Sequence, residues 1–198
     1  MTAPRAAVHT APVPAPPVGS TLDELASRVG AFRWVEMRRF EILGGWVPTV
    51  PEPEVKLLLA RHSVHHGWHA ELLAECLPST KDHDPERSTA PPSAALVDVL
   101  GRIAGETATL DRLVAAYQVL GPELIAAYDR LVDGLNPASD AAARRVLRVV
   151  LHEQVDHVTE GLLAVETLAA VEPDRADAVA AARDRYRGLL AAAGGIEG

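Results

Sequence analysis

Hydrophobic residues recur at helical spacing along most of this chain. In the first such stretch they share one face of an α-helix, since that face repeats about every three to four residues. The apolar positions are Leu22, Leu25, Val29, Phe32, Phe40 and Leu43. Thr21 and Glu24 form a capping-box pattern that predicts a start near residue 20, and Gly44-Gly45 predicts the end. The position that completes the apolar face is acidic: Glu36.

The same periodicity predicts further helices over residues 53–77, 93–121, 122–135, 138–170 and 173–193. Gly121-Pro122 and Asn136-Pro137 are the expected breaks between the later ones. The polar, proline-rich segment 78–92 is long enough to cross a helix bundle lengthwise. Alternating patterns typical of strands are absent. The predicted fold class is therefore all-α, a bundle with additional short and C-terminal helices.

Composition sets the domain limits. The chain has 198 residues, of which 48% are hydrophobic, enough for one sizeable core. We expect a single helical domain over residues 20–194. Residues 1–19 are rich in alanine and proline and are expected to form a disordered arm. The tail 195–198 is expected to fray.

Charge and cysteine content narrow the class further. A net charge of −8 without a basic cluster predicts no nucleic-acid binding, and no apolar run is long enough for a membrane span. Cys76 is the only cysteine, so no internal disulfide can form and a reducing cytoplasm is the expected compartment. The charged last helix predicts either a solvated surface or a homodimer contact.

Histidines concentrate on helix 53–77. His62, His65, His66 and His69 lie within eight residues of one another, and the chain has eight histidines in all. Helix 138–170 repeats the same spacing with four polar residues: Glu153, Asp156, His157 and Glu160. In helix 93–121 the position that completes the apolar face is again acidic, Glu106.

Carboxylates on apolar faces need partners, because an unpaired buried charge costs several kcal/mol. Histidines and acids that face them across a bundle would form a metal site. The predicted ligands are Glu36, His62, His65, His69, Glu106, Glu153 and His157. His66 is expected at the flank, as an outer residue. Mixed nitrogen and oxygen ligands suit iron or manganese, with zinc or copper as alternatives.

Other interpretations remain open for these residues. Glu36 could instead pair with Arg33 or Arg39, and Asp156 and Glu160 could form a solvated face. A mononuclear site using Cys76 is a further alternative. The tryptophans are expected to pack, or alternatively to line a substrate pocket.

The spacing resembles the ferritin-like di-iron carboxylate superfamily. That family has a four-helix bundle with a long crossover, a single Glu on each of two helices and Glu-x-x-His on each of the other two. Glu36 and Glu106 match the single Glu positions. His62-x-x-His65, and again His66-Gly67-Trp68-His69 with its apolar continuation, match one Glu-x-x-His motif with His in the Glu place. Glu153-x-x-Asp156 matches the other with Asp in the His place, and Glu153-x-x-x-His157 is one residue longer.

The resemblance covers residues 20–170 and implies function as well as fold. It implies two iron ions per chain and a non-haem di-iron oxygenase or oxidase. Such an enzyme acts with O₂ and an electron donor on a small organic substrate, as N-oxygenases of natural-product pathways do. The histidine-rich second helix departs from the family pattern and lowers the negative charge of the site, which argues against ordinary iron storage. A ferritin-like metal-storage protein is the first alternative, and a metal-free helical interaction domain is the second.

Overall fold

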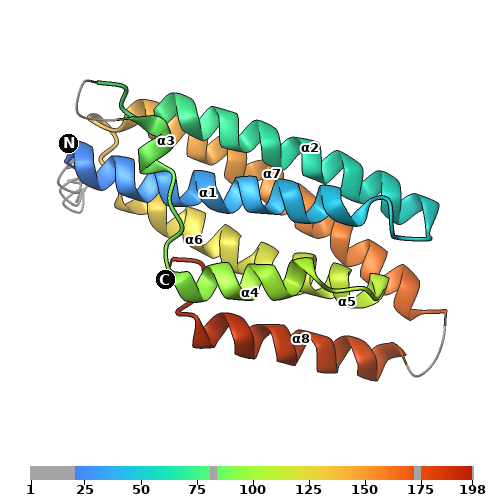
Figure 1. The fold of residues 1–198 in the computed structure, drawn as a ribbon. Helices are drawn as coiled ribbons and strands as arrows, with labels where there is room; N and C mark the ends of the chain where they lie inside the picture. The colour runs from blue at the N-terminus through green and yellow to red at the C-terminus, as the bar shows by residue number, and fades with distance from the viewer. Residues whose placement is uncertain (1–20, 81–83, 172–174, 198) are drawn as a thin grey trace, which may run out of the picture.

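The computed structural model describes residues 21–80, 84–171 and 175–197, and these form helices, turns and loops without strands. The all-α prediction is confirmed (Figure 1). The long helices are α1 (Leu22–Trp46), α2 (Pro53–Cys76), α6 (Gly121–Gly134), α7 (Ala141–Ala169) and α8 (Arg175–Ala192). The shorter ones are α3 (Pro85–Ser88), α4 (Ala94–Ala104), α5 (Thr109–Leu113) and the π-helix η1 (Val114–Leu120). The arm expected over residues 1–19 lies outside the described residues.

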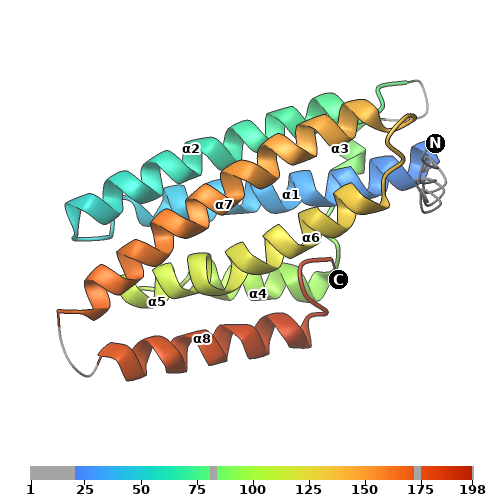
Figure 2. The ribbon, with the colours of Figure 1, turned by 180° about the vertical axis from the view of Figure 1, so that it is seen from behind.

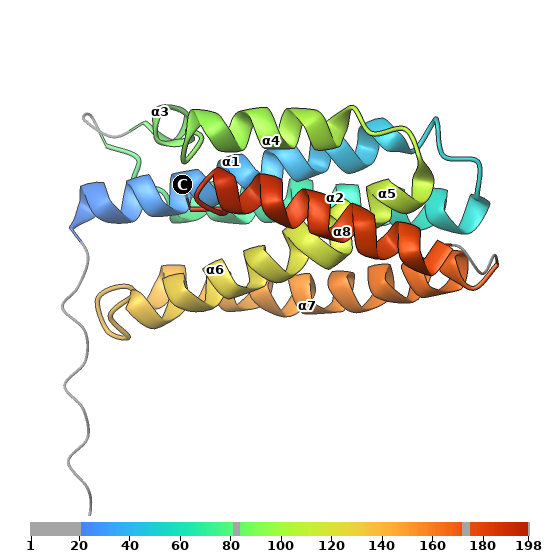
Figure 3. The ribbon, with the colours of Figure 1, turned by 90° about the horizontal axis from the view of Figure 1, so that it is seen from below.

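The helices form a bundle whose long members lie side by side. Helices α1 and α2 run antiparallel, α7 lies along α2, and α6 lies along α7 (Figures 1 and 2). Helix α8 packs on the outer side against η1, α5 and α4 (Figure 3). None of the helices within the described ranges combines the length and apolarity that crossing a membrane requires.

Local sequence signals fix the ends of α1. The Thr21 hydroxyl accepts a hydrogen bond from the Glu24 backbone N–H, and the Glu24 carboxylate accepts one from the Thr21 N–H, as the capping box predicts. The helix continues past Gly44-Gly45 to Trp46. That residue is buried, and its indole N–H donates to the carbonyl of Ala104 at 3.1 Å. Packing against α4 therefore extends the helix beyond its glycine signal.

The prediction of one continuous helix over residues 93–121 is wrong. Helix α4 ends at Ala104 with Gly105 as its C-cap. The Glu106 carboxylate then accepts hydrogen bonds from the N–H groups of Thr107 and Ala108 in the following turn. At the expected break, Gly121-Pro122, the helix instead continues from η1 into α6. The π-helical turns come directly before Pro122, whose missing N–H interrupts the regular α-helical hydrogen-bond pattern.

Two close contacts hold the centre of the bundle together. The Ser63 hydroxyl of α2 donates to the carbonyl of Phe40 in α1 at 2.8 Å. Gly161 of α7 faces Tyr117 of η1, where a Cβ would lie only 2.0 Å from the ring. Tyr117 is fully buried. These contacts bring α1, α2, η1 and α7 close to one another at the level of the histidines.

The C-terminal segment packs against the bundle where the sequence predicted fraying. Ile196 is buried, and the Glu197 carboxylate accepts hydrogen bonds from the Arg130 guanidinium. The buried apolar side chain and the ion pair anchor the segment just before the final glycine.

Candidate metal centre

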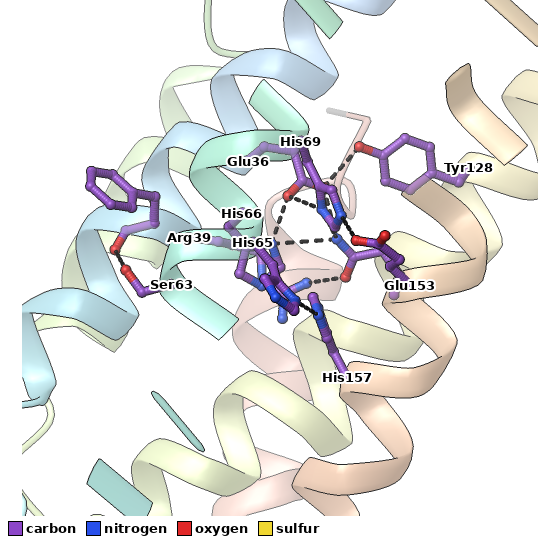
Figure 4. A network of polar contacts seen from close by, with 11 residues as sticks. Glu36, Arg39, Ser63, His65, His66, His69, Tyr128, Glu153 and His157 are labelled. Carbon is purple, nitrogen blue, oxygen red and sulfur yellow. Dashed lines mark hydrogen bonds and ion pairs between the residues drawn. The ribbon is translucent and has the colours of Figure 1, made fainter. Parts of the chain in front are cut away.

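Helices α1 and α2 bring a carboxylate and two histidines together in the core. The Nδ1 of His66 lies 2.6 Å from Glu36 Oε2, and the Nδ1 of His69 lies 3.4 Å from the same oxygen (Figure 4). All three residues are inaccessible to solvent. They offer ligand atoms that all lie within 4.8 Å of one another. We call them the inner group.

A second group of the same composition lies beside the first. His65 of α2 and His157 of α7 share a hydrogen bond of 2.8 Å between Nδ1 and Nε2, and Glu153 completes the set (Figure 4). His157 is buried, whereas His65 and Glu153 are partly accessible. We call these residues the outer group. Each group therefore contains two imidazoles and one carboxylate.

His69 connects the two groups. Its Nε2–H donates to Glu153 Oε2 at 2.8 Å, while its Nδ1 faces Glu36. Burial alone would lower the pKa of His69, but the hydrogen bonds to the two carboxylates outweigh it and raise this pKa above its usual value. The two carboxylates therefore favour a proton on both nitrogens of His69. A metal ion could take the place of that proton, because ligand imidazoles bind in their neutral form.

His157 lies at the centre of an unusual collection of imidazoles. Its ring centroid is 4.2 Å from that of His62, 5.0 Å from His65, 5.4 Å from His66 and 5.8 Å from His69. Burial together with the charges of the neighbouring histidines and Arg39 lowers the pKa of His157 far below its usual value. Its neutral ring retains a lone pair that a metal ion could use.

Two buried histidine nitrogens lack hydrogen-bond partners among the described residues. They are Nε2 of His66 and Nδ1 of His157. Because His66 uses Nδ1–H to donate to Glu36, its Nε2 must carry a lone pair. Burial, and then the charge of Arg39, lower the pKa of His66 to about 3, which keeps that lone pair free of a proton. They are two of seven such buried side-chain atoms among the described residues, and Nη2 of Arg39 in the same centre is another. An imidazole nitrogen with a free lone pair is a donor that a metal ion can use.

A second layer of polar residues fixes the orientation of Glu36. Its Oε1 accepts hydrogen bonds from the Tyr128 hydroxyl at 2.8 Å and from the Gln154 amide at 3.0 Å. The amide oxygen of Gln154 in turn accepts from the guanidinium of buried Arg39 at 2.9 Å. Burial raises the pKa of Glu36, but interactions with His66 and His69 prevail and hold it well below its usual range. Glu36 is therefore an oriented anion.

His62 lies beside the centre but has both nitrogens occupied. Its Nε2–H donates to Glu160 Oε2 at 3.0 Å, and its Nδ1 accepts from the Tyr117 hydroxyl at 2.8 Å. Burial lowers the pKa of His62 to about 4, despite the nearby Glu160 carboxylate. Glu160 also pairs with Arg61, and both Glu160 and Asp156 are exposed, as the alternative of a solvated face predicts.

Most, but not all, predicted ligands meet. The structure brings together Glu36, His65, His69, Glu153 and His157, with His62 stacked at the edge. Glu106 does not join them, which corrects its assignment as a ligand. Its carboxylate instead accepts hydrogen bonds from the Tyr186 hydroxyl and from Arg185, on the α8 side of the bundle. The turn at Gly105 redirects the chain there and removes Glu106 from the bundle interior.

The sequence placed His66 at the flank, whereas it is a central residue. The predicted orientation of α2 about its axis rests on residues that are only half-buried: Leu58, Leu72 and Cys76. The fully buried positions are Leu59 and Leu73, one residue further on, and this rotation turns His66 inward. No sequence pattern identifies Gln154 and Tyr128 as residues of the site, since neither is charged and each occupies an ordinary helical position. The proposed pairing of Glu36 with Arg39 is realised indirectly, through Gln154.

Comparison with protein-family models, with curated proteins and with solved structures finds no match to this chain. The class of the protein therefore follows from its own fold and site. It is a helical bundle with a buried cluster of histidines and glutamates that could hold metal ions.

Proposed function

We propose that this chain is a non-haem iron protein of ferritin-like architecture that uses O₂ to oxidise a small organic substrate. In this proposal the inner group (Glu36, His66, His69) and the outer group (His65, Glu153, His157) each hold one metal ion. The observation that carries it is the pair of unpartnered buried nitrogens, His66 Nε2 and His157 Nδ1.

The ligand types favour iron among the metals considered. Two histidines with one carboxylate is the set typical of non-haem Fe(II) oxygenases, and both groups have it. Iron held there would supply the electrons with which O₂ reacts. Manganese, zinc and copper are alternatives that the same nitrogen and oxygen donors accept. An electron donor would be needed for repeated turnover.

The remaining residues of the centre position and insulate it. Tyr128 and Gln154 orient Glu36, and the charge of Arg39 partly balances the Glu36 carboxylate. Helices α6 and η1 contribute tyrosines where the ferritin-like pattern has a carboxylate. This carboxylate-poor arrangement supports an enzyme over a storage protein, which needs many acidic groups to collect iron.

A metal-free polar core is the second candidate. It is favoured by the complete hydrogen bonding of Glu36, which already has donors on both oxygens. It assigns no role to the two unpartnered imidazole nitrogens, which the metal centre would use as ligands.

Ferrous loading followed by O₂ tests the proposal. Anaerobic protein without a histidine tag would be titrated with Fe²⁺, mixed with O₂ and followed by absorption spectroscopy. We expect a transient visible band in the wild type and its loss in His66→Ala and His157→Ala. The control His152→Ala changes an exposed histidine of α7 outside both groups and should retain the band. Saturation with iron but no reaction with O₂ would refute the oxidase, and failure to take up any metal would favour the metal-free core.

A further inference from the structure

A hydrophobic groove of about 460 Å³ runs between α2 and α7 beside the metal centre. Its apolar walls are formed by Val55, Leu58, Leu163, Ala164 and Leu168. Sites for small organic molecules typically enclose about 300–1,000 Å³ and combine apolar walls with a few polar groups. The groove therefore has the size and lining of a ligand site.

The inner end of the groove borders the centre. Arg61 and Glu160 line this end and pair with each other. Glu160 accepts a hydrogen bond from His62, whose ring stacks on His157 at 4.2 Å. Glu160 and His62 thus lie between a molecule in the groove and His157 of the outer group.

The charge distribution disfavours an anionic ligand. Three carboxylates line the groove, those of Glu52, Glu54 and Glu160, against the one guanidinium of Arg61. The start of α2 and the end of α7 meet at the outer end, so their opposite helix-dipole charges largely cancel. Arg175 lies near this end and donates to the carbonyl of Leu168, which leaves the negative charges in excess.

We propose that the groove binds a small organic amine as a cation and presents it to the centre as its substrate. The ammonium lies at the outer end, near Glu52 and Glu54, and the apolar body extends along Leu58 and Leu163. Arg61 lies nine residues after Glu52, a helical rise of about 14 Å, which suits a chain of octyl length. The role as substrate rests on the proposed function, whereas the binding itself does not.

Calorimetric titration with octylamine, octanol and octanoate tests the ligand class. It would be carried out on the full chain after treatment with chelator and again after loading with Fe²⁺. We expect octylamine to bind at least about tenfold more tightly than either of the other two, in both forms. Equal or tighter binding of octanol or octanoate, or no binding of octylamine, would overturn the proposal.

Two variants and one matched control locate the site. Leu163→Arg places a cation in the groove and should weaken octylamine binding by about tenfold or more. The matched control Leu57→Arg changes another exposed leucine, on α2 outside the groove, and should leave the affinity unchanged. Glu54→Gln should weaken binding of octylamine but not of octanol. Equal effects of Leu163→Arg and Leu57→Arg would contradict the assignment, provided that thermal melts show both variants folded.

The same titrations separate the two proposals. Amine binding by a protein that takes up no metal would leave the groove assignment intact and refute the function. Metal uptake without amine binding would refute the groove assignment and leave the metal centre intact.

Discussion

At the scale of single residues, the centre shows how a carboxylate can be buried in a hydrophobic bundle. Glu36 has no exposed surface, yet Tyr128 and Gln154 donate to one oxygen and His66 to the other. Arg39 supports the arrangement through Gln154. Each donor offsets part of the cost of removing the anion from water. The same network leaves Nε2 of His66 and Nδ1 of His157 without hydrogen-bond partners among the described residues.

Replacing Arg39 tests this network. Arg39→Met removes the buried cation and leaves the Gln154 amide oxygen without its donor. We expect the free energy of unfolding of metal-free protein to fall by about 3 kcal/mol, measured by urea denaturation. The control Arg38→Met removes a partly exposed arginine of the same helix that pairs with Glu41, and should cost less than about 1 kcal/mol. Similar losses in both variants would show that Arg39 has no special role.

The lowered histidine pKa values predict acid sensitivity of the metal-free protein. The pKa is about 4 for His62 and about 3 for His66, and that of His157 is also lowered. Unfolding exposes these rings, which then take up protons below about pH 6.5. Stability is therefore fully present above that pH and is lost as the pH falls from about 6.5 towards 4, by about 1.4 kcal/mol per pH unit for each histidine.

The other ionisable groups of the centre act outside this window. The raised pKa of His69 gives a stabilisation that is fully present below about pH 6.5, and therefore constant within this window, and that is lost as the pH rises above it. The lowered pKa of Glu36 gives a stabilisation that is present above its usual titration range and is lost only as the pH falls below that range. Urea denaturation at a series of pH values checks the prediction, and a stability that stays constant between pH 6.5 and 4 would contradict it.

At the scale of helices, the sequence predicts elements better than it predicts their rotation. The start of α1 follows from Thr21 and Glu24, whose reciprocal hydrogen bonds are local. The orientation of α2 about its own axis depends on which leucines the neighbouring helices cover. Because Leu58 is only half-buried, it indicates the wrong orientation and places His66 at the flank. The density of histidines nevertheless identified α2 as a ligand helix. The position of Glu106 depends on the turn at Gly105 and on Tyr186 of α8, and no local sequence pattern predicts either contribution.

Gly161 is the residue that allows η1 and α7 to approach. A methyl group there would overlap the ring of Tyr117, so Gly161→Ala should lower the free energy of unfolding by about 1–3 kcal/mol. On α8, a Cβ added at Gly188 meets no atom within 4 Å. Gly188→Ala should therefore stabilise by about 0.5–1 kcal/mol, as expected for glycine in a helix interior. Thermal melts of both variants measure the contrast, and loss of stability at Gly188 alone would contradict it.

At the scale of the whole molecule, the centre joins helices that are distant in sequence. Glu36 comes from α1, the histidine cluster from α2, and Glu153 and His157 from α7. Each metal ion, bound to ligands from two of these helices, stabilises the folded state only, since the unfolded chain does not hold the ligands together. We expect saturating metal, at about 100 times its dissociation constant, to raise the free energy of unfolding by about 2.7 kcal/mol. Chelator should reverse the rise, and an unchanged melting temperature would argue against a shared site.

Metal stoichiometry tests the central claim most directly. Protein purified without a histidine tag, reconstituted anaerobically with Fe²⁺ and freed of loose metal, would be assayed by elemental analysis. The two ligand groups predict about two iron ions per chain in the wild type and in His152→Ala, falling to about one in His66→Ala. No retained metal after reconstitution, or equal retention in wild type and His66→Ala, would contradict the proposed centre.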